Sequence, residues 1–282
     1  MGIRAAFLFL AIILTSVDLR ACTLWGAAGT ETSGGTIVVK NRDSKPDHTQ
    51  VLKMCRPEKG HAYFGLWTVY ADKDAGGIVA GVNEKGLTVF TAAAGSIPRR
   101  MWGDRPVRRT FTGALLADHA SCDEVLANRA AIFPALRPAF IMLSDREKIL
   151  TVEVGLGGKY ALKTIGDGVV AHTNHYLDDS LAEFNISANE SSLKRLGRIT
   201  HLLEVSPRPF TAECFAVMGK DQHDGPDNSL WRTGKVARTL ATWIVETPAR
   251  GAPRLRVAIA NPGQPEQTHT IVLDEPFWKR GM

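Results

Sequence analysis

The sequence predicts an α+β protein in which two antiparallel sheets are covered by helices. Short strand-like segments dominate the chain and helical patterns interrupt them, so that the order is strands, helices, strands, helix, strands. Hydrophobic residues make up 44% of the 282 residues and charged residues 22%, which is typical of a folded globular chain. No internal repeat, linker or low-complexity segment divides it, so one large layered domain is expected.

The strands are expected to be short and joined by turns. Cys22–Ala27 and Thr36–Lys40 form the arms of a first hairpin, because the polar, glycine-rich residues 32–35 between them favour a turn. Further strands are expected at Tyr63–Tyr70, Gly77–Val82, Leu87–Ala92, Phe140–Ser144, Ile149–Val154, Lys159–Thr164, Val169–Thr173, Lys235–Thr247, Leu255–Ala260 and Thr268–Leu273.

Two segments have helical periodicity. Residues 111–132 carry apolar residues at helical spacing, with a break and a new helix start near Ser121. Ser191–Val205 places its leucines and isoleucine on one stripe, and Pro207 ends the pattern. We expect Ser191 or Ser192 to cap this helix.

The first 21 residues have the pattern of an export signal. Arg4 precedes the apolar run Ala5–Val17, and a short polar stretch then leads to Ala21. We therefore expect residues 1–21 to be a signal peptide and residues 22–282 to be one exported catalytic domain, periplasmic or extracellular. Beyond the signal, no apolar run of about 18 residues predicts a membrane span.

Cleavage after Ala21 would make Cys22 the first residue of the mature chain. Cys22 would then carry a thiol nucleophile and a free α-amine on the same carbon. An N-terminal amine titrates at about 7.7–8.0, so a neutral fraction is present near neutral pH and can take the thiol proton. One residue would supply both the nucleophile and the base of an amide hydrolase.

Two other interpretations of Cys22 stay open. Residues 19–22 resemble a bacterial lipobox, in which Cys22 carries a lipid, although Arg20 is a poor match beside that cleavage point. Alternatively, Cys22 is a core or disulfide cysteine. If Cys22 stays free, Cys55, Cys122 and Cys214 allow one disulfide in an oxidising compartment, and the sequence does not choose the pair.

Charge and composition limit the partners. The net charge is +5, but the basic residues are spread along the chain and do not alternate with aromatic residues as in a nucleic-acid-binding surface. The spacing of cysteines and histidines matches no zinc site, and the predicted chemistry needs neither a metal nor an organic cofactor. The expected partner is a small-molecule substrate, and a homo-oligomer stays open.

Polar motifs supply the other groups that a cysteine amide hydrolase needs, which are donors for an oxyanion and groups that orient the base. Asp43 ends the Lys40-Asn41-Arg42-Asp43 turn and could hydrogen-bond the α-amine of Cys22. Asn83, in the turn at residues 81–87, and Asn174, after a strand, carry amide N–H groups for the oxyanion. As alternatives, Asp43 and Asn83 are turn residues and Asn174 is part of a capped loop.

Two arginines are the remaining candidates for the functional site. Arg195 and Arg198 lie three residues apart on neighbouring faces of the amphipathic helix. Either could reach a site carboxylate or the substrate, and both could equally lie on a solvated face.

In this order and at these separations, the motifs resemble those of the choloylglycine hydrolase and acyl-coenzyme A:6-aminopenicillanic acid acyltransferase group of N-terminal nucleophile hydrolases. The resemblance covers nearly the whole chain after residue 21, and the tail with Ala260-Asn261-Pro262-Gly263 is similar to the acyltransferase-like branch. It implies a four-layer αββα fold and cleavage of linear, non-peptide C–N amide bonds.

The resemblance also implies a role for each matching residue. Relatives of the bile-salt type carry Arg at the position of Lys40, and Lys is a point donor rather than a planar fork, so the identity of the thiolate partner is open between Lys40 and Arg42. The implied roles are nucleophile for Cys22, orientation of the amine for Asp43, oxyanion donation for Asn83 and Asn174, a site arginine for Arg195, and substrate binding for Lys40, Arg42 and Arg198.

We therefore expect an exported cysteine amidohydrolase that cleaves an N-acyl amide through a thioester on Cys22. Acyl transfer to an amine, or dipeptidase activity, is the alternative on the same fold. Outside the enzymes, the alternative is a non-catalytic exported lipoprotein or binding module anchored at Cys22.

Overall fold

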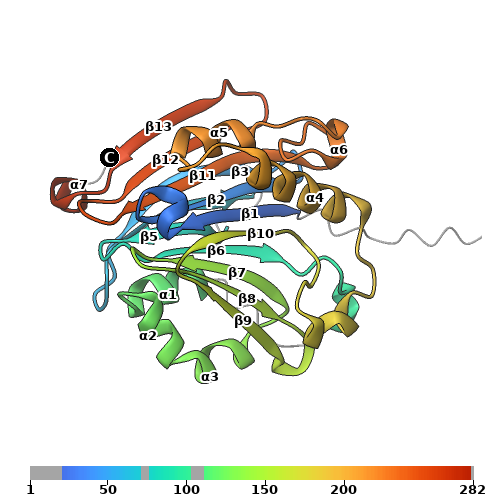
Figure 1. The fold of residues 1–282 in the computed structure, drawn as a ribbon, viewed down its shortest axis with the longest axis horizontal. Helices are drawn as coiled ribbons and strands as arrows, with labels where there is room; N and C mark the ends of the chain where they lie inside the picture. The colour runs from blue at the N-terminus through green and yellow to red at the C-terminus, as the bar shows by residue number, and fades with distance from the viewer. Residues whose placement is uncertain (1–20, 71–75, 103–110, 281–282) are drawn as a thin grey trace, which may run out of the picture.

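The computed structural model describes residues 21–70, 76–102 and 111–280. Two antiparallel sheets lie face to face at the centre, and helices cover both outer faces (Figure 1). The predicted αββα order of layers is confirmed. Apart from Ala21, the predicted export signal lies outside the described residues.

The six-stranded sheet holds the start of the predicted mature chain. Its strand β1 lies between β10 and β2, and all neighbouring strands pair antiparallel. Because helices cover one face and the second sheet covers the other, β1 is buried at every residue and shows a continuous apolar run rather than alternation. The strands in spatial order are β10 (Gly168–His172), β1 (Cys22–Ala28), β2 (Gly35–Ser44), β11 (Arg238–Pro248), β12 (Arg254–Ile259) and β13 (Gln267–Val272).

The seven-stranded sheet is a meander in which strands that follow one another in sequence are neighbours. Strands β5 and β6 are joined by the turn from Asn83 to Gly86, where Gly86 has a φ of +90°, a conformation that favours glycine. The strands in order are β3 (Thr49–Cys55), β4 (Tyr63–Val69), β5 (Ile78–Asn83), β6 (Thr88–Ala93), β7 (Ala139–Ser144), β8 (Ile149–Val154) and β9 (Tyr160–Ile165).

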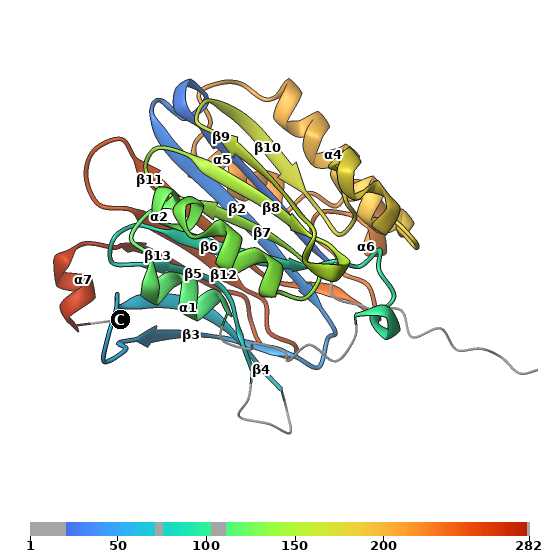
Figure 2. The ribbon, with the colours of Figure 1, turned by 90° about the horizontal axis from the view of Figure 1, so that it is seen from below.

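Helices form the outer layers (Figures 1 and 2). On the seven-stranded sheet lie α1 (Phe111–Asp118), α2 (Cys122–Ala127) and α3 (Arg129–Ile132), and on the outer side of the six-stranded sheet lie α4 (Glu190–Val205), α5 (Ala212–Gly219) and α6 (Gly225–Asn228). The helix α7 (Glu275–Arg280) packs Phe277 edge-on against Phe64 of β4. Short 3-10 helices are η1 (Gly29–Thr32), η2 (Arg99–Met101), η3 (Phe133–Ala135), η4 (Leu156–Gly158) and η5 (Asp179–Phe184).

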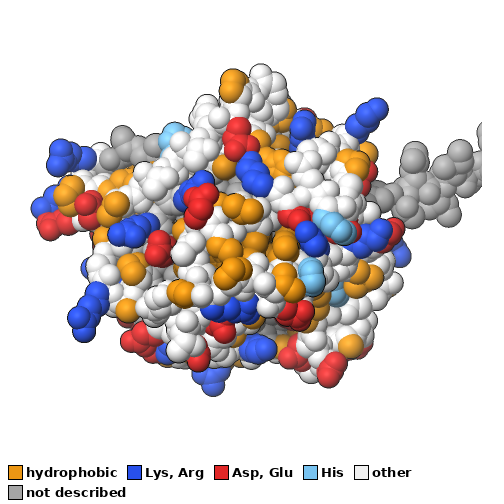
Figure 3. All heavy atoms as spheres, turned by 45° about the horizontal axis from the view of Figure 1, so that its top comes forward, with side chains coloured by type: hydrophobic (Ala, Val, Ile, Leu, Met, Phe, Trp, Pro, Cys, Tyr) orange, Lys and Arg blue, Asp and Glu red, His pale blue; other side chains and the backbone are white. Residues whose placement is uncertain are grey.

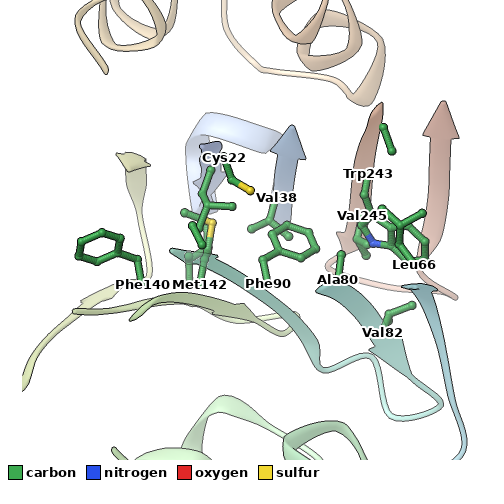
Figure 4. Packing of buried hydrophobic residues seen from close by; sticks show 14 of the residues in the cluster. Cys22, Val38, Leu66, Ala80, Val82, Phe90, Phe140, Met142, Trp243 and Val245 are labelled. Carbon is green, nitrogen blue, oxygen red and sulfur yellow. The ribbon is translucent and has the colours of Figure 1, made fainter. Parts of the chain in front are cut away.

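Three apolar clusters hold the layers together. One lies between the sheets and includes Cys22, Val38, Phe90 and Trp243 (Figure 4). A second joins the seven-stranded sheet to α1–α3, and a third joins the six-stranded sheet to α4 and α5. Since the first cluster contains Cys22, the thiol lies inside the sandwich rather than on its surface.

The predicted strands and helices are present within a few residues of their expected bounds, with one difference that affects the site. Helix α4 begins at Glu190, and the side chain of Asn189 accepts a hydrogen bond from Ser192 N at 2.8 Å. Asn189 is therefore the N-cap, and the prediction of Ser191 or Ser192 was wrong. Ser192 is instead buried in the first turn, where its hydroxyl reaches the functional site.

Candidate active site

Cys22 is the first residue of β1 and only 3% exposed. It pairs with Arg42 across the β1–β2 ladder, and its sulfur points between the two sheets (Figure 4). Its nitrogen is joined to Ala21 by a peptide bond, so this atom would become the α-amine after cleavage. The start of an inner strand therefore places both the thiol and this nitrogen inside the protein.

Asn174 lies next to Cys22 because of strand register. His172 at the end of β10 pairs with Leu24, so the chain two residues further on lies beside Cys22. Asn174 Oδ1 accepts a hydrogen bond from Cys22 N at 3.0 Å, and Asn174 Nδ2 donates one to Ala93 O at 2.8 Å. The Asn174 backbone N–H donates to Ser192 Oγ at 2.9 Å, which fixes the loop against α4.

Arg195 reaches the same point from α4 and is fully buried. Its Nη1 donates to Cys22 O at 2.9 Å and to Thr23 Oγ1 at 2.8 Å, and its Nη2 donates to Asn174 Oδ1 at 3.0 Å. Burial lowers the pKa of Arg195 to about 10, partly offset by the charge of Asp43, so the guanidinium stays protonated near neutral pH. Arg195 therefore joins the Cys22 carbonyl to the side chains of Thr23 and Asn174.

Asp43 is fully buried near the end of β2. Its Oδ1 accepts a hydrogen bond from Thr239 Oγ1 at 2.7 Å, at a register shift between β2 and β11. Its Oδ2 lies 3.9 Å from Arg232 Nη1 and has no hydrogen-bond donor among the described residues. Burial raises the pKa of Asp43, and the charges of Arg195 and Arg232 oppose that rise.

Lys40 points from β2 between the sheets and is 1% exposed. Its Nζ donates to Val79 O at 2.9 Å and to Thr91 O. The β1–β2 register makes Lys40 the diagonal neighbour of Cys22 on this face of the sheet. Burial lowers the pKa of Lys40 to about 8, against the raising effect of Cys22.

Arg42 is also buried, and its guanidinium contacts Asp43 O at 2.8 Å and the hydroxyls of Ser44 and Thr68 at 3.3 Å. Within the described residues Arg42 has no carboxylate partner, and its Nε has no acceptor. The charges of Arg195, Arg232 and Arg42 act on one buried carboxylate, that of Asp43. Buried cations and N–H donors of this kind stabilise a developing oxyanion.

The structure does not bring Asn83, the other predicted oxyanion donor, to Cys22. Asn83 Nδ2 donates to Leu116 O at 2.7 Å and to His119 O at 2.8 Å, and its Oδ1 accepts from the N–H groups of Lys85 and Leu87 at 3.0 Å. Because side chains alternate along β5, Asn83 points toward α1 while Val82 faces the space between the sheets. Asn83 holds a turn and the end of a helix, on the far side of its sheet from Cys22.

Arg198 does not join the residues around Cys22 either. It lies one turn beyond Arg195 and forms an ion pair with Asp221, with Nη2 2.6 Å from Oδ2. Its contact with the substrate stays a prediction. The structure does bring together Cys22, Lys40, Arg42, Asp43, Asn174 and Arg195.

Sequence reasoning missed three residues around the site. Thr239 donates to Asp43 Oδ1, Arg232 Nη1 lies 3.9 Å from Asp43 Oδ2, and Ser192 accepts from the backbone N–H of Asn174. None of these three residues stands in a pattern that differs from an ordinary loop, strand or helix start. A further buried pair, His172 Nε2 and Glu153 Oε1 at 3.2 Å, lies beside the site on β10 and β8. Among the described residues, no cluster of His, Cys, Asp and Glu has the arrangement of a metal site.

All four cysteines have free thiols, so the structure contains none of the disulfides that Cys55, Cys122 and Cys214 could form.

A cavity of about 770 Å³ lies on the outer side of the six-stranded sheet, beside α4 and α5. Figure 3 shows the face that carries these helices, where hydrophobic, acidic and basic side chains are interspersed. The cavity is lined by residues such as Leu202, Cys214 and Met218 and does not include Cys22, so we place the chemistry at Cys22 rather than there.

Two stacked antiparallel sheets between helical layers, with a strand that starts at the buried site, form the fold of the N-terminal nucleophile hydrolases. The chain belongs to the acyl-coenzyme A:6-aminopenicillanic acid acyl-transferase family, whose family model matches residues 30–263. No curated protein matches the chain by sequence.

Solved structures share the fold at low sequence identity. A mutant of the conjugated bile acid hydrolase from Clostridium perfringens is 14% identical, with a TM-score of 0.54 over 88% of this chain and 92% of that one. The penicillin V acylase from Agrobacterium tumefaciens is 16% identical, with a TM-score of 0.52 over 90% of this chain and 89% of that one. Family and fold together support an amide hydrolase or acyltransferase of the N-terminal nucleophile type.

None of the helices in the described part of the chain has the length and apolar character needed to cross a membrane.

Proposed function

We propose that this protein is an exported cysteine amidohydrolase that cleaves a linear, non-peptide N-acyl amide through a thioester on Cys22. The observation that carries the proposal is the convergence on Cys22. Asn174 contacts its nitrogen, Arg195 contacts its carbonyl, and Lys40 is its diagonal neighbour on the face between the sheets. These contacts come from three separate parts of the sequence.

The unsatisfied oxygen of Asp43 supports cleavage between Ala21 and Cys22. A peptide nitrogen has one proton, and Cys22 N already uses it on Asn174 Oδ1. An α-ammonium has three, so cleavage would supply further donors in the region where buried Asp43 Oδ2 has none. A free α-amine held between Asn174 and Asp43 would be oriented to act on the thiol and on the leaving nitrogen.

The oxyanion would be stabilised by two donors beside Cys22. One N–H of Asn174 Nδ2 is used by Ala93 O, which leaves the second for the substrate. The other donor would be the backbone N–H of Ala94, just after β6, because Ala94 is buried in the same cluster as Cys22 and follows Ala93, whose carbonyl binds Asn174. Each such donor typically contributes about 10²–10³ in rate. Water would then attack the thioester and release the acid.

Acyl transfer is the second candidate that an observation favours, because the family is that of an acyl-transferase. In that case an amine rather than water would attack the thioester.

The test is turnover of a panel of N-acyl amides by the exported protein and by its C22A and C22S variants. The panel includes bile conjugates, penicillin V and N-acyl homoserine lactones. We expect both variants to lose turnover of any amide that the parent cleaves, and retained turnover in C22A would refute the proposal. Adding a primary amine such as 6-aminopenicillanic acid separates the two candidates, because only an acyltransferase forms the new amide in preference to the acid.

A further inference from the structure

We propose that Lys40 Nζ takes the proton of the Cys22 thiol, which leaves the α-amine to serve the leaving nitrogen. This inference rests on the proposed role of Cys22 as nucleophile. It adds a second base to a site in which one residue was expected to supply both nucleophile and base.

The geometry of the Lys40 nitrogen carries the argument. Its Nζ donates to two backbone carbonyls of the opposite sheet, Val79 O on β5 and Thr91 O on β6. These carbonyls can only accept, so they fix two N–H bonds in either protonation state. The β1–β2 register pairs Cys22 with Arg42 and Leu24 with Lys40, so Lys40 is the diagonal neighbour of Cys22 on the face between the sheets. We assign the remaining tetrahedral position of Nζ to the Cys22 thiol. It holds a third N–H in the ammonium and a lone pair in the neutral amine.

Proton transfer along this contact balances without another reactant. The S–H bond breaks, its electron pair stays on sulfur, and the proton forms the third N–H bond of Lys40. The product is a thiolate beside an ammonium, and the proton returns to sulfur when the thioester is resolved. Both Val79 O and Thr91 O keep their hydrogen bonds throughout, so the nitrogen does not need to move.

The surroundings allow Lys40 to exist in both forms near neutral pH. The ionisable groups that act on it are Cys22 on β1 and Arg42 and Asp43 on its own strand, whereas β5 and β6 present the backbone carbonyls. Burial lowers the pKa of Lys40 to about 8, with a smaller lowering by Arg42 and raising effects of Cys22 and Asp43. An arginine here would stay charged and could stabilise a thiolate but not accept its proton.

The first test measures alkylation of Cys22 by iodoacetamide from pH 5 to 10, followed by mass spectrometry of the Cys22 peptide. An otherwise identical chain that begins at Ala21 has no α-amine on Cys22, so it isolates the effect of Lys40. Cys55, a half-buried thiol of β3, is measured in the same samples as the internal control. At pH 7 we expect Cys22 to be alkylated about 10-fold or more faster in the chain that retains Lys40 than in the K40M variant, because a neighbouring cation favours the thiolate. Equal rates in the two chains would overturn the coupling of Lys40 to Cys22.

The K40R variant separates proton transfer from a fixed charge. It keeps the positive charge and hydrogen-bond donors, so we expect fast alkylation at pH 7 and thermal unfolding close to that of the parent. Its turnover in the mature chain should fall by about 10²-fold, since general base catalysis typically contributes at least that much. If K40R turns over substrate as fast as the wild type, Lys40 contributes only its positive charge, and the proposal is overturned.

The C22A variant tells the two proposals apart. If C22A retains turnover, Cys22 is not the nucleophile, and both the proposed function and this inference fail. If C22A is inactive and K40R is fully active, Lys40 is not the proton acceptor, but the proposed function still stands. If K40M fails to fold, the K40R comparison of alkylation and turnover still decides the question.

Discussion

Asn174 Oδ1 accepts a hydrogen bond from Cys22 N at 3.0 Å, although 152 residues separate them in the chain. The same oxygen accepts from Arg195 Nη2 at 3.0 Å, so one amide oxygen connects the start of β1 to helix α4. Asn174 Nδ2 extends the contact to Ala93 at the end of β6, in the opposite sheet. The site is therefore assembled at the point where the two sheets and α4 meet.

The two asparagines predicted as oxyanion donors should respond differently to the same substitution. We expect N174A to lower turnover by about 10²–10³-fold, because it removes the amide beside Cys22. N83A should leave turnover per folded molecule unchanged and lower the free energy of unfolding by roughly 2–4 kcal/mol, because two buried carbonyls lose their donor. Denaturant unfolding and initial rates on matched samples check both. The reverse pattern would restore the sequence-based role of Asn83.

A second matched pair lies on α4. In R195K a single ammonium cannot span Cys22 O, Thr23 Oγ1 and Asn174 Oδ1, so we expect turnover to fall by about 10²-fold. In R198A only the ion pair with Asp221 is lost, so stability should change by roughly 1 kcal/mol and turnover should not change. Equal loss of turnover in both variants would indicate that Arg198 contacts the substrate after all.

Asp43 should matter for its charge rather than its shape. D43N keeps the side-chain volume and the contact with Thr239, but it removes the negative charge that would hold the α-ammonium. We expect kcat to fall by about 10²-fold or more with little change in KM. Steady-state kinetics over a range of pH checks this, with T239V as the control that keeps the carboxylate and removes only one donor. A D43N variant as active as T239V would argue against the orientation of the amine by Asp43.

His175 should make the protein less stable in mild acid. Burial lowers the pKa of His175 below its ordinary value of 6.5, and the charges of His172 and Arg195 lower it further. As the pH falls below 6.5, the unfolded chain takes up this proton before the folded one, so the free energy of unfolding decreases toward the native pKa. The slope is at most about 1.4 kcal/mol per pH unit for one proton.

The H175N variant provides the comparison for this prediction. Asn keeps a hydrogen-bonding group for Ser192 Oγ, which lies 2.8 Å from His175 Nδ1, but it does not titrate. Chemical denaturation between pH 5 and 7.5 should show a smaller loss of stability in H175N than in the parent. Parallel curves for the two chains would mean that His175 does not contribute to the acid sensitivity.

The layered fold was predictable because it depends on local patterns. The hairpin of β1 and β2 follows from apolar runs around a glycine-rich turn, and α4 follows from a clear amphipathic stripe. β3 was missed because Lys53 and Gln50 interrupt the apolar pattern of an edge strand, and α5 and α7 were missed because each is a short helix of one or two turns.

The site was predictable only in part, for a physical reason. Asn83 and Asn174 both look like turn residues in sequence, and which one reaches Cys22 depends on the direction of a side chain on β5 and the register between β1 and β10. Arg232 and Thr239 were missed because their role depends on a register shift opposite Asp43 that no local pattern indicates. Contacts between distant strands decided the outcome at each of these residues.

The central claim is that the working chain starts with Cys22 and an unmodified amine. The most direct test is the mass of the N-terminal proteolytic peptide of the exported, purified protein. We predict a peptide that begins at Cys22 with a free thiol and a free amine. A peptide that begins at another residue, or one with a fatty chain on Cys22, would contradict the account.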